Sequence, residues 1–377
     1  MMWKWRLGSL IVSMFILSAV VFAGANTTSA QSGTATSASP VATPAPTATT
    51  LPVVAAYTAM QPLTHIDIGP IAGKTGSFDI LEIDQEAHLL YVADRTDNGV
   101  DVLDVSTPTA TYLRTIDVGS GANGVSVAKD VNKLFVANNN SEIVIIDITP
   151  GATGDTILAR LNTGGKKRAD EMDYDPTDHK LYVANSDDGI VTAIDAVNNT
   201  VITRFDNLGE GLEQPRYNAG DGMMYMTSST QNAVFLFDPT KDVLVKKMDV
   251  GVVCGPNGLA INPKTNQALL GCSDKKTQAT VIFDLTTGQA LTSFYQAGAG
   301  DSAIYNATAD RFFFAASGYY RGGQLAVFSG GAPVQFITNV PTTPGSHAVA
   351  YDETNNIVYV PDQRPNMGGV LSFPAPA

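Results

Sequence analysis

The chain has 377 residues, with 23 basic and 36 acidic side chains and a formal net charge of −13 at pH 7. A surface this acidic repels phosphate groups, which argues against nucleic acid as a partner. The sequence also lacks a Gly-x-Ser-x-Gly or His-Glu-x-x-His motif, a zinc-spaced cysteine pair and a glycine-rich phosphate loop, so the enzyme classes that depend on them are disfavoured.

Residues 1–30 have the pattern of a secretory signal peptide. Lys4 and Arg6 precede a long apolar run, and small residues offer cleavage after Ala25 or Ala30. An uncleaved membrane anchor is the alternative, because an apolar run of about 19 residues is at the lower limit for spanning a bilayer. Both interpretations predict an exported protein, secreted or in the cell envelope, and signal cleavage would leave no membrane span.

Residues 31–56 consist almost wholly of Thr, Ser, Ala, Pro and other small or apolar residues and carry no charge. Such a composition buries too little apolar surface to offset the loss of chain entropy on folding. We therefore predict a disordered linker ahead of the folded domain.

Residues 57–377 are predicted to form one repeat domain. A segment of the type Leu-Tyr-Val-Ala-Asn occurs seven times, at steps of 43 to 47 residues. Several short alternating segments separated by Asn, Asp, Gly and Pro within a repeat of about 45 residues are typical of a four-stranded propeller blade. The sequence thus predicts an all-β, seven-bladed β-propeller with antiparallel blades. The segments begin at Leu90, Leu134, Leu181, Met224, Ala268, Phe312 and Val358.

The last repeat is one strand short, because the sequence ends soon after the segment 369–373. Residues 63–69 (LTHIDIG) closely match residues 113–119 (LRTIDVG), which are the expected fourth strand of the first blade. We therefore expect the N-terminal strand to complete the last blade. Closing the ring removes exposed sheet edges, and the protein is expected to be a monomer.

The two cysteines, Cys254 and Cys272, lie 18 residues apart. Thiols in exported proteins tend to be oxidised, so a disulfide is expected, with two buried free thiols as the alternative. The spacing matches no metal-binding motif.

The repeated strands LYVAN (181–185), LFVAN (134–138) and VYVPD (358–362) resemble those of the YVTN-repeat β-propeller family, and the resemblance covers all seven repeats. It implies a seven-bladed propeller in an exported or cell-envelope protein and implies little about chemistry. WD-repeat propellers fit less well, because the repeats contain no tryptophan.

Eleven residues before each repeat start, all seven repeats have a polar residue. The first strand of a propeller blade lines the central channel, so these side chains are expected to form one ring at its mouth. Crowded carboxylates there require a bound cation, a shared proton or a cationic side chain, whereas a wide, water-filled mouth requires none. The imidazole of His347 is expected to be cationic. The ring consists of Asp79, Asn123, Asp170, Glu213, Asn257, Asp301 and His347.

Oxygen ligands of this kind favour Ca²⁺ or Mg²⁺. The segment PNGLAINP (256–263), with Asp301 in the next repeat, resembles the ligand segments of gluconolactonase and regucalcin-like propellers. The resemblance implies that Asn257 and Asp301 bind a metal. Glu213 would replace the family's glutamate by ring position only, because the family's Glu-Gly-Pro motif is absent. In such a hydrolase, Asp79 or Asp170 is the candidate general base.

Three positions deeper than the ring, Asp173 and Arg216 come from neighbouring repeats and are expected to form an ion pair. A looser arrangement would let Arg216 bind an anionic ligand. Arg321 and Arg364 belong to loops on the side of the ring. The candidate ligand-binding residues are therefore Asn123, Arg216, His347, Arg321 and Arg364.

These features favour a binding module that presents its ring-side face to a small molecule, a glycan or a protein. The alternative is a lactonase-type hydrolase that depends on a divalent metal, so whether the protein is an enzyme stays open. A ligand-free structural role in the cell envelope is a third interpretation.

Overall fold

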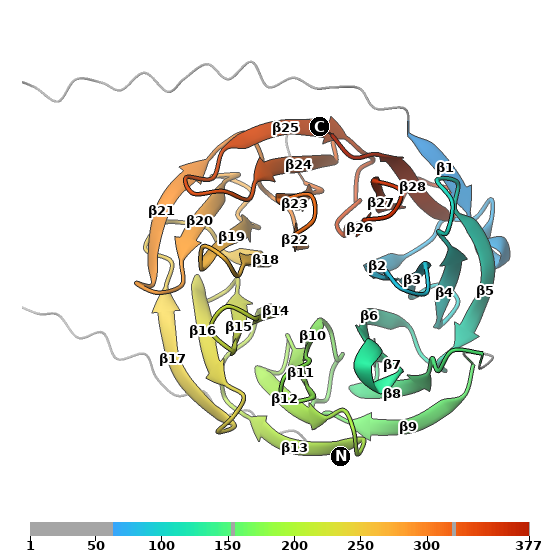
Figure 1. Cartoon of the computed structure of the whole chain (residues 1–377), viewed down its shortest axis with the longest axis horizontal. Coiled ribbons are helices and arrows are strands. Elements are labelled where there is room, and N and C mark those ends of the chain that lie inside the picture. Colours follow the sequence, from blue (N-terminus) through green and yellow to red (C-terminus); the bar gives the residue numbers. More distant parts are fainter. Residues whose placement is uncertain (1–62, 152–154, 319–321, 377) are drawn as a thin grey trace, which may run out of the picture. The chain divides into compact units, whose positions relative to one another are not determined.

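Seven four-stranded antiparallel sheets surround a central axis (Figure 1). The predicted seven-bladed β-propeller is therefore confirmed. The computed structural model describes residues 63–151, 155–318 and 322–376, and the predicted signal peptide and linker lie outside them. Within these described ranges, no helix is long and apolar enough to cross a membrane.

Each blade places its first strand next to the channel and its second strand behind it. The inner strands are β2 (Phe78–Asp84), β6 (Ala122–Ala128), β10 (Met172–Asp175), β14 (Leu212–Asn218), β18 (Pro256–Asn262), β22 (Ala303–Asn306) and β26 (Ala350–Asp352). The second strands are β3 (Leu89–Asp94), β7 (Lys133–Asn138), β11 (Lys180–Asn185), β15 (Met223–Ser228), β19 (Gln267–Cys272), β23 (Arg311–Ala316) and β27 (Ile357–Asp362).

The other two strands of each blade lie farther from the axis. The third strands are β4 (Gly99–Asp104), β8 (Glu142–Asp147), β12 (Ile190–Asp195), β16 (Ala233–Asp238), β20 (Thr280–Asp284), β24 (Gln324–Ser329) and β28 (Gly369–Pro374). The outer strands are β5 (Thr111–Asp117), β9 (Ile157–Asn162), β13 (Thr200–Phe205), β17 (Val243–Asp249), β21 (Gln289–Phe294), β25 (Phe336–Pro341) and β1 (Thr64–Asp67). Two short 3₁₀ helices complete the described elements, η1 (Gly69–Ile71) and η2 (Lys129–Val131).

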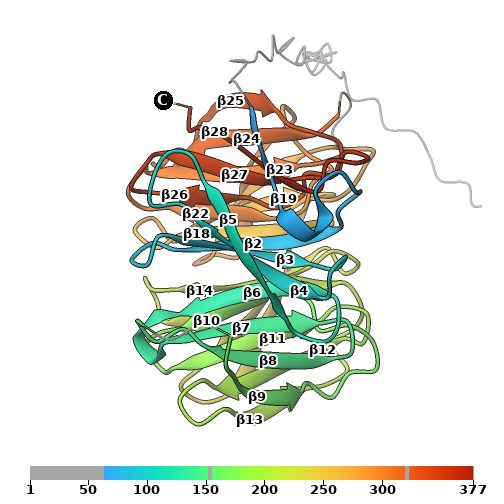
Figure 2. The ribbon, with the colours of Figure 1, turned by 90° about the vertical axis from the view of Figure 1, so that its right-hand side faces the viewer.

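Packing between blades explains why the second strand of each repeat is almost wholly apolar. In β11, Leu181 and Val183 pack against the second blade, whereas Tyr182 and Ala184 pack against the fourth. A strand buried on both faces needs apolar residues at consecutive positions rather than at alternate ones. Twist accumulates across each sheet, so the outer strand β5 crosses the inner strand β2 steeply in Figure 2.

The N-terminal strand closes the ring as predicted. Strand β1 pairs with β28 in an antiparallel register, from Thr64 opposite Ser372 to Asp67 opposite Gly369. The last sheet therefore combines one strand from the start of the domain with three from its end. This pairing gives the last blade the same four strands as the others.

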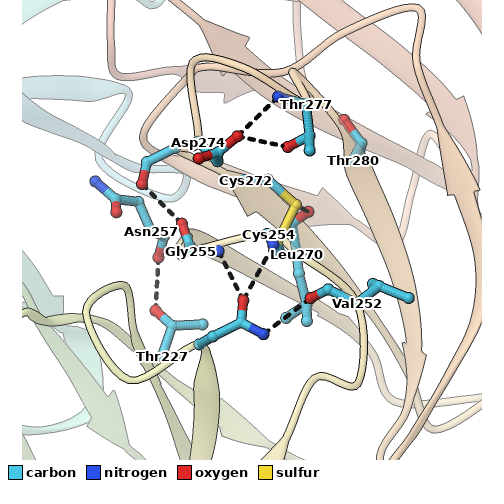
Figure 3. Close-up of a disulfide and its surroundings, with 12 residues drawn as sticks. Thr227, Val252, Cys254, Gly255, Asn257, Leu270, Cys272, Asp274, Thr277 and Thr280 are labelled. Carbon is cyan, nitrogen blue, oxygen red and sulfur yellow. Dashed lines mark hydrogen bonds between the residues drawn. A yellow bond between two sulfur atoms is a disulfide. The ribbon is translucent and has the colours of Figure 1, made fainter.

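The predicted disulfide is present and joins Cys254 to Cys272 in β19 (Figure 3). Cys254 and Gly255 lie just before β18. Their backbone N–H groups donate hydrogen bonds to the side chain of Asn232, at 3.0 and 2.8 Å. The carbonyl of Asn257 accepts a hydrogen bond of 2.6 Å from Thr227. The bridge and these hydrogen bonds hold the segment that carries one ring residue.

We predict that replacing both cysteines with serine lowers the free energy of unfolding by about 3 kcal/mol, because the bridge closes a loop of 18 residues. Urea denaturation of the oxidised protein and of the variant measures the difference. A reductant should destabilise the wild type and leave the variant unchanged. An unchanged wild-type transition in reductant would contradict the prediction.

Candidate functional site

Polar side chains from different blades meet at one end of the channel. The Nε2 atom of His347, in the last blade, lies 2.9 Å from Oδ1 of Asp79 in the first. Asn257 donates a hydrogen bond of 3.2 Å from Nδ2 to Oδ1 of Asp301, which links the fifth and sixth blades. Carboxyl oxygens of Glu213 and Asp301 approach within 4.8 Å although a blade lies between them. These contacts confirm that the ring residues converge.

Arg95 and His347 flank Asp79. Arg95, which follows β3, forms an ion pair with Asp79 through Nη2 and donates a 2.7 Å hydrogen bond from Nε to Oδ1 of the buried Asn123. His347 also has Nδ1 at 2.7 Å from the carbonyl oxygen of Gly345, so each ring nitrogen has an oxygen at hydrogen-bond distance. Nε2 of Gln363 also lies 3.3 Å from Nδ1 of His347, and the expected cationic form of this imidazole stays a prediction.

Asp170 also has an arginine partner. Nη2 of Arg168 lies 2.9 Å from Oδ2 of Asp170. Burial nevertheless raises the pKa of Asp170 to about 6, although the charges of Arg168 and Arg95 oppose the rise. Both arginines come from loops on the ring side, and the ring prediction did not include them. The general-base roles of Asp79 and Asp170 stay predictions. Both carboxylates form ion pairs with arginines.

Three further carboxylates, here called the acidic triad, have no such partner. The triad consists of Glu171, Glu213 and Asp301, from the third, fourth and sixth blades, and one oxygen of each lies within 4.8 Å of the other two. Among the described residues, no basic side chain lies within 4.0 Å of these carboxylates. At an effective dielectric of about 20, each pair of ionised groups would repel by roughly 3 kcal/mol.

Burial and mutual repulsion disfavour ionisation of the triad. Removal from water raises the pKa of Glu213 to about 8, and the charge of Asp301 adds to the effect. The same two causes hold the pKa of Glu171 well above its ordinary range. Ser229 donates a hydrogen bond of 2.9 Å to Glu213 and partly opposes the rise. Without a counter-ion, Glu171 and Glu213 therefore retain protons near neutral pH.

Two oxygen atoms at the triad lack a hydrogen-bond donor among the residues that the structure describes. They are Oε2 of Glu171, a residue only 6% exposed, and Oδ1 of Asn257. A buried oxygen without a donor is costly. The residues therefore fit a hard cation that takes oxygen ligands.

The sequence pattern did not predict Glu171 as a channel residue, because a β-bulge turns its side chain into the channel. The N–H of Asp170 donates to the carbonyl of Ala184, and the N–H of Ala184 donates to the carbonyl of Glu171. Two consecutive residues, Asp170 and Glu171, therefore pair with the single residue Ala184, which is the pattern of a β-bulge. Strict alternation would have placed neighbouring side chains on opposite faces. Register shifts also occur at the ring in the first, second, fourth and fifth blades. The consecutive acids at 170 and 171 were the available signal.

The predicted ion pair between Asp173 and Arg216 is wrong. Within the described parts of the chain, Arg216 has no carboxylate within 4.0 Å. Its guanidinium instead donates to the carbonyls of Pro215, at 2.7 Å, and Ala303, at 3.4 Å. Oδ2 of Asp173 accepts a hydrogen bond of 2.6 Å from the N–H of Tyr217. This backbone donor takes the place that the arginine was expected to fill.

Arg364 makes no hydrogen bond or ion pair with the described ring residues, and Arg321 lies outside the described residues. Arg364 makes a two-pronged ion pair with Asp362, at 2.9 and 2.6 Å. Asp362 is also 2.9 Å from Nδ1 of His65 in β1, so Arg364 takes part in holding the closing strand. Its role in ligand binding stays a prediction. Arg321 falls in the segment 319–321, which is not described.

No protein-family model matches the sequence, and no curated protein matches it. A chain of a solved structure titled "Crystal Structure of Mitotic Checkpoint Complex" is 15% identical, with a TM-score of 0.66, and the match covers 90% of this chain and 99% of that one. "Structure of U3-55K" and "Crystal structure of RRP9 WD40 repeats" are each 10% identical over 83% of this chain and 98% and 99% of theirs, with TM-scores of 0.66 and 0.65.

Identities this low establish the fold alone, and the fold is a seven-bladed β-propeller. The resemblance to YVTN-repeat propellers and the local resemblance to gluconolactonase stay predictions. The comparisons give no support to the lactonase alternative.

We predict that cation-free protein loses stability as pH rises from about 5 to about 8. Glu213 ionises near 4.5 when unaffected by the fold and near 8 in the folded protein. Across this window the folded state binds the extra proton, so the free energy of unfolding falls by up to about 1.4 kcal/mol per pH unit. Urea denaturation in chelator across this range measures the slope.

The variant Glu213→Gln should make this pH dependence less steep, and Glu171, whose pKa is also raised, should account for part of the slope that remains. Glu210→Gln is the matched control, because it removes one acidic charge from an exposed residue nearby. Equal slopes in the wild type and Glu213→Gln would show that Glu213 does not retain its proton.

Proposed function

We propose that this protein is an exported binding propeller that holds one divalent cation at the acidic triad and docks a protein partner on the same face. The observation that carries the proposal is the convergence of Glu171, Glu213 and Asp301 within 4.8 Å, with Oε2 of Glu171 buried and without a donor among the described residues. A cation would remove the repulsion and supply the missing partner.

Calcium fits this set of ligands best. Ca²⁺ accepts six to eight oxygen atoms in flexible geometry, whereas Mg²⁺ requires a near-ideal octahedron and retains several waters. The triad supplies carboxylate oxygen atoms from three blades, and no histidine or thiol is among them. The remaining coordination positions would be open toward the channel mouth, where a partner can contribute an oxygen.

A basic loop beside the ring favours a partner with acidic side chains. Lys166 and Lys167 are exposed and precede Arg168, whose guanidinium lies at the ring. The backbone N–H groups of both lysines donate to Asp188, at 2.9 and 2.8 Å, so the loop is fixed in place. A carboxylate on a partner could therefore meet the lysines and the cation together. One similar propeller belongs to a structure titled as a complex, which supports docking of proteins by this fold.

Export is supported by two independent features. The N-terminal residues carry the signal-peptide pattern, and the propeller contains a disulfide between Cys254 and Cys272. Structural disulfides form and persist in oxidising compartments outside the cytosol. The hydrolase alternative is not proposed, because no observation at the site favours it over binding.

We predict that chelator-stripped protein binds one Ca²⁺ per chain in a calorimetric titration. Glu171→Gln and Asp301→Asn should each weaken binding by at least about tenfold, because each removes a charged ligand. Saturation at about 100 times the dissociation constant should stabilise the wild type by about 2.7 kcal/mol.

Glu210→Gln is again the control and should bind Ca²⁺ as the wild type does, since Glu210 is exposed. A wild-type protein that shows neither binding heat nor a thermal shift in millimolar Ca²⁺ would refute the proposed function.

We also predict that a glutamate-rich peptide binds the Ca²⁺-loaded protein and not the chelated one. Fluorescence anisotropy of a labelled peptide measures this. Lys166→Gln combined with Lys167→Gln should weaken binding by at least about tenfold while leaving the Ca²⁺ titration unchanged. Peptide binding that ignores both Ca²⁺ and the lysines would contradict docking at this face.

A further inference from the structure

A second cavity lies in the channel, deeper than the ring. Its volume is about 270 Å³, and its walls come from the inner strands of six blades. Gln214 separates it from the ring: its Nε2 donates a hydrogen bond of 3.0 Å to Ser302, and its Oε1 accepts from the N–H groups of Leu259 and Ala303, at 2.7 and 3.0 Å. This buried amide spans from the fourth blade to the sixth. The cavity is therefore distinct from the triad site.

One wall of the cavity presents a cation with unused donors. The guanidinium of Arg216 contacts two backbone carbonyls and, among the described residues, no carboxylate within 4.0 Å. Arginine has five N–H donors in a planar arrangement that matches a carboxylate. A ligand carboxylate is the group that would use the donors left over.

The wall from the first and third blades presents two acids. Glu82 and Asp173 both line the cavity. Loss of water and the charge of Asp173 together raise the pKa of Glu82 to about 8, although a backbone hydrogen bond from Val127 and the charge of Arg216 oppose the rise. A positively charged group beside Glu82 would restore its ionised form. A ligand ammonium would have this effect.

The two charged walls then select the ligand class. A simple carboxylate would leave Glu82 without a cationic partner, and a simple amine would leave the spare donors of Arg216 unused. A zwitterion can place its ammonium near Glu82 and its carboxylate near Arg216. The rest of the lining includes Ile80, Val125, Met172, Ile304 and Val349, which form an apolar surface.

The two tyrosines of the lining add apolar surface rather than free hydroxyl groups. The hydroxyl of Tyr217 is 2.7 Å from that of Thr177, and the hydroxyl of Tyr305 donates to Asp310 at 2.8 Å. We infer that the cavity binds a free α-amino acid with an apolar side chain, with its carboxylate on Arg216, its ammonium on Glu82 and its side chain against the apolar wall. This site shares no residue with the acidic triad.

The test is calorimetric titration of the whole protein with three compounds that share one branched side chain. L-leucine carries both charged groups, 4-methylpentanoate lacks the ammonium, and 3-methylbutylamine lacks the carboxylate. Leucine should bind with one site per chain, and each analogue should bind at least about tenfold more weakly. Equal binding of either analogue, or no saturable leucine binding in the millimolar range, would overturn the inference.

Variants of the two charged walls locate the site. Arg216→Gln and Glu82→Gln should each weaken leucine binding by at least about tenfold. Arg114→Gln and Glu210→Gln are matched controls, because these side chains line neither the cavity nor the triad. If Arg216→Gln fails to fold, Arg216→Lys and Glu82→Gln decide the outcome, and undiminished binding in both would refute the site.

Chelator separates this inference from the proposed function. Leucine binding should be the same in chelator and in Ca²⁺, because Gln214 separates the two sites. Leucine binding without Ca²⁺ binding would refute only the proposed function, and the reverse result would refute only the amino acid site.

Discussion

The structure depends on one electrostatic constraint, the concentration of carboxylates where seven inner strands approach a common axis. Each blade contributes a polar residue, and water screens Asp79, Asp170 and Glu171 little because these side chains are buried. Arg95 and Arg168 compensate two carboxylates by direct ion pairs. The acidic triad has no such compensation among the described residues. These uncompensated carboxylates are the reason that this end of the channel is the candidate site.

The fold was predictable because its signals are local and repeated. A second strand buried between two blades must be apolar on both faces, so the LYVAN-type segment recurs in every blade. Ring closure was predictable because residues 63–69 are a copy of another blade's outer strand. The disulfide followed from two cysteines in a chain whose N-terminal sequence has the pattern of an export signal. In each case a single physical requirement, such as the burial of both faces of a strand, determines the residues of one short segment.

The site was only partly predictable because its contacts depend on local departures from regular structure. Counting positions located the seven ring residues, and their convergence is confirmed by the contacts of His347 and Asp301. The bulge that turns Glu171 inward breaks strand alternation, and no spacing rule anticipates it. Arg95 comes from a loop whose conformation the sequence does not specify. Arg216 lies in the channel as expected. Its expected partner, Asp173, instead accepts a hydrogen bond from the backbone N–H of Tyr217.

The proposed function rests on the binding of a cation by the acidic triad. A crystal structure of the full chain grown in millimolar Ca²⁺ tests it most directly. The account predicts one ion with oxygen atoms of Glu171, Glu213 and Asp301 at about 2.3–2.6 Å. Triad carboxyls that share protons and hydrogen-bond to one another, with no ion between them under these conditions, would contradict it.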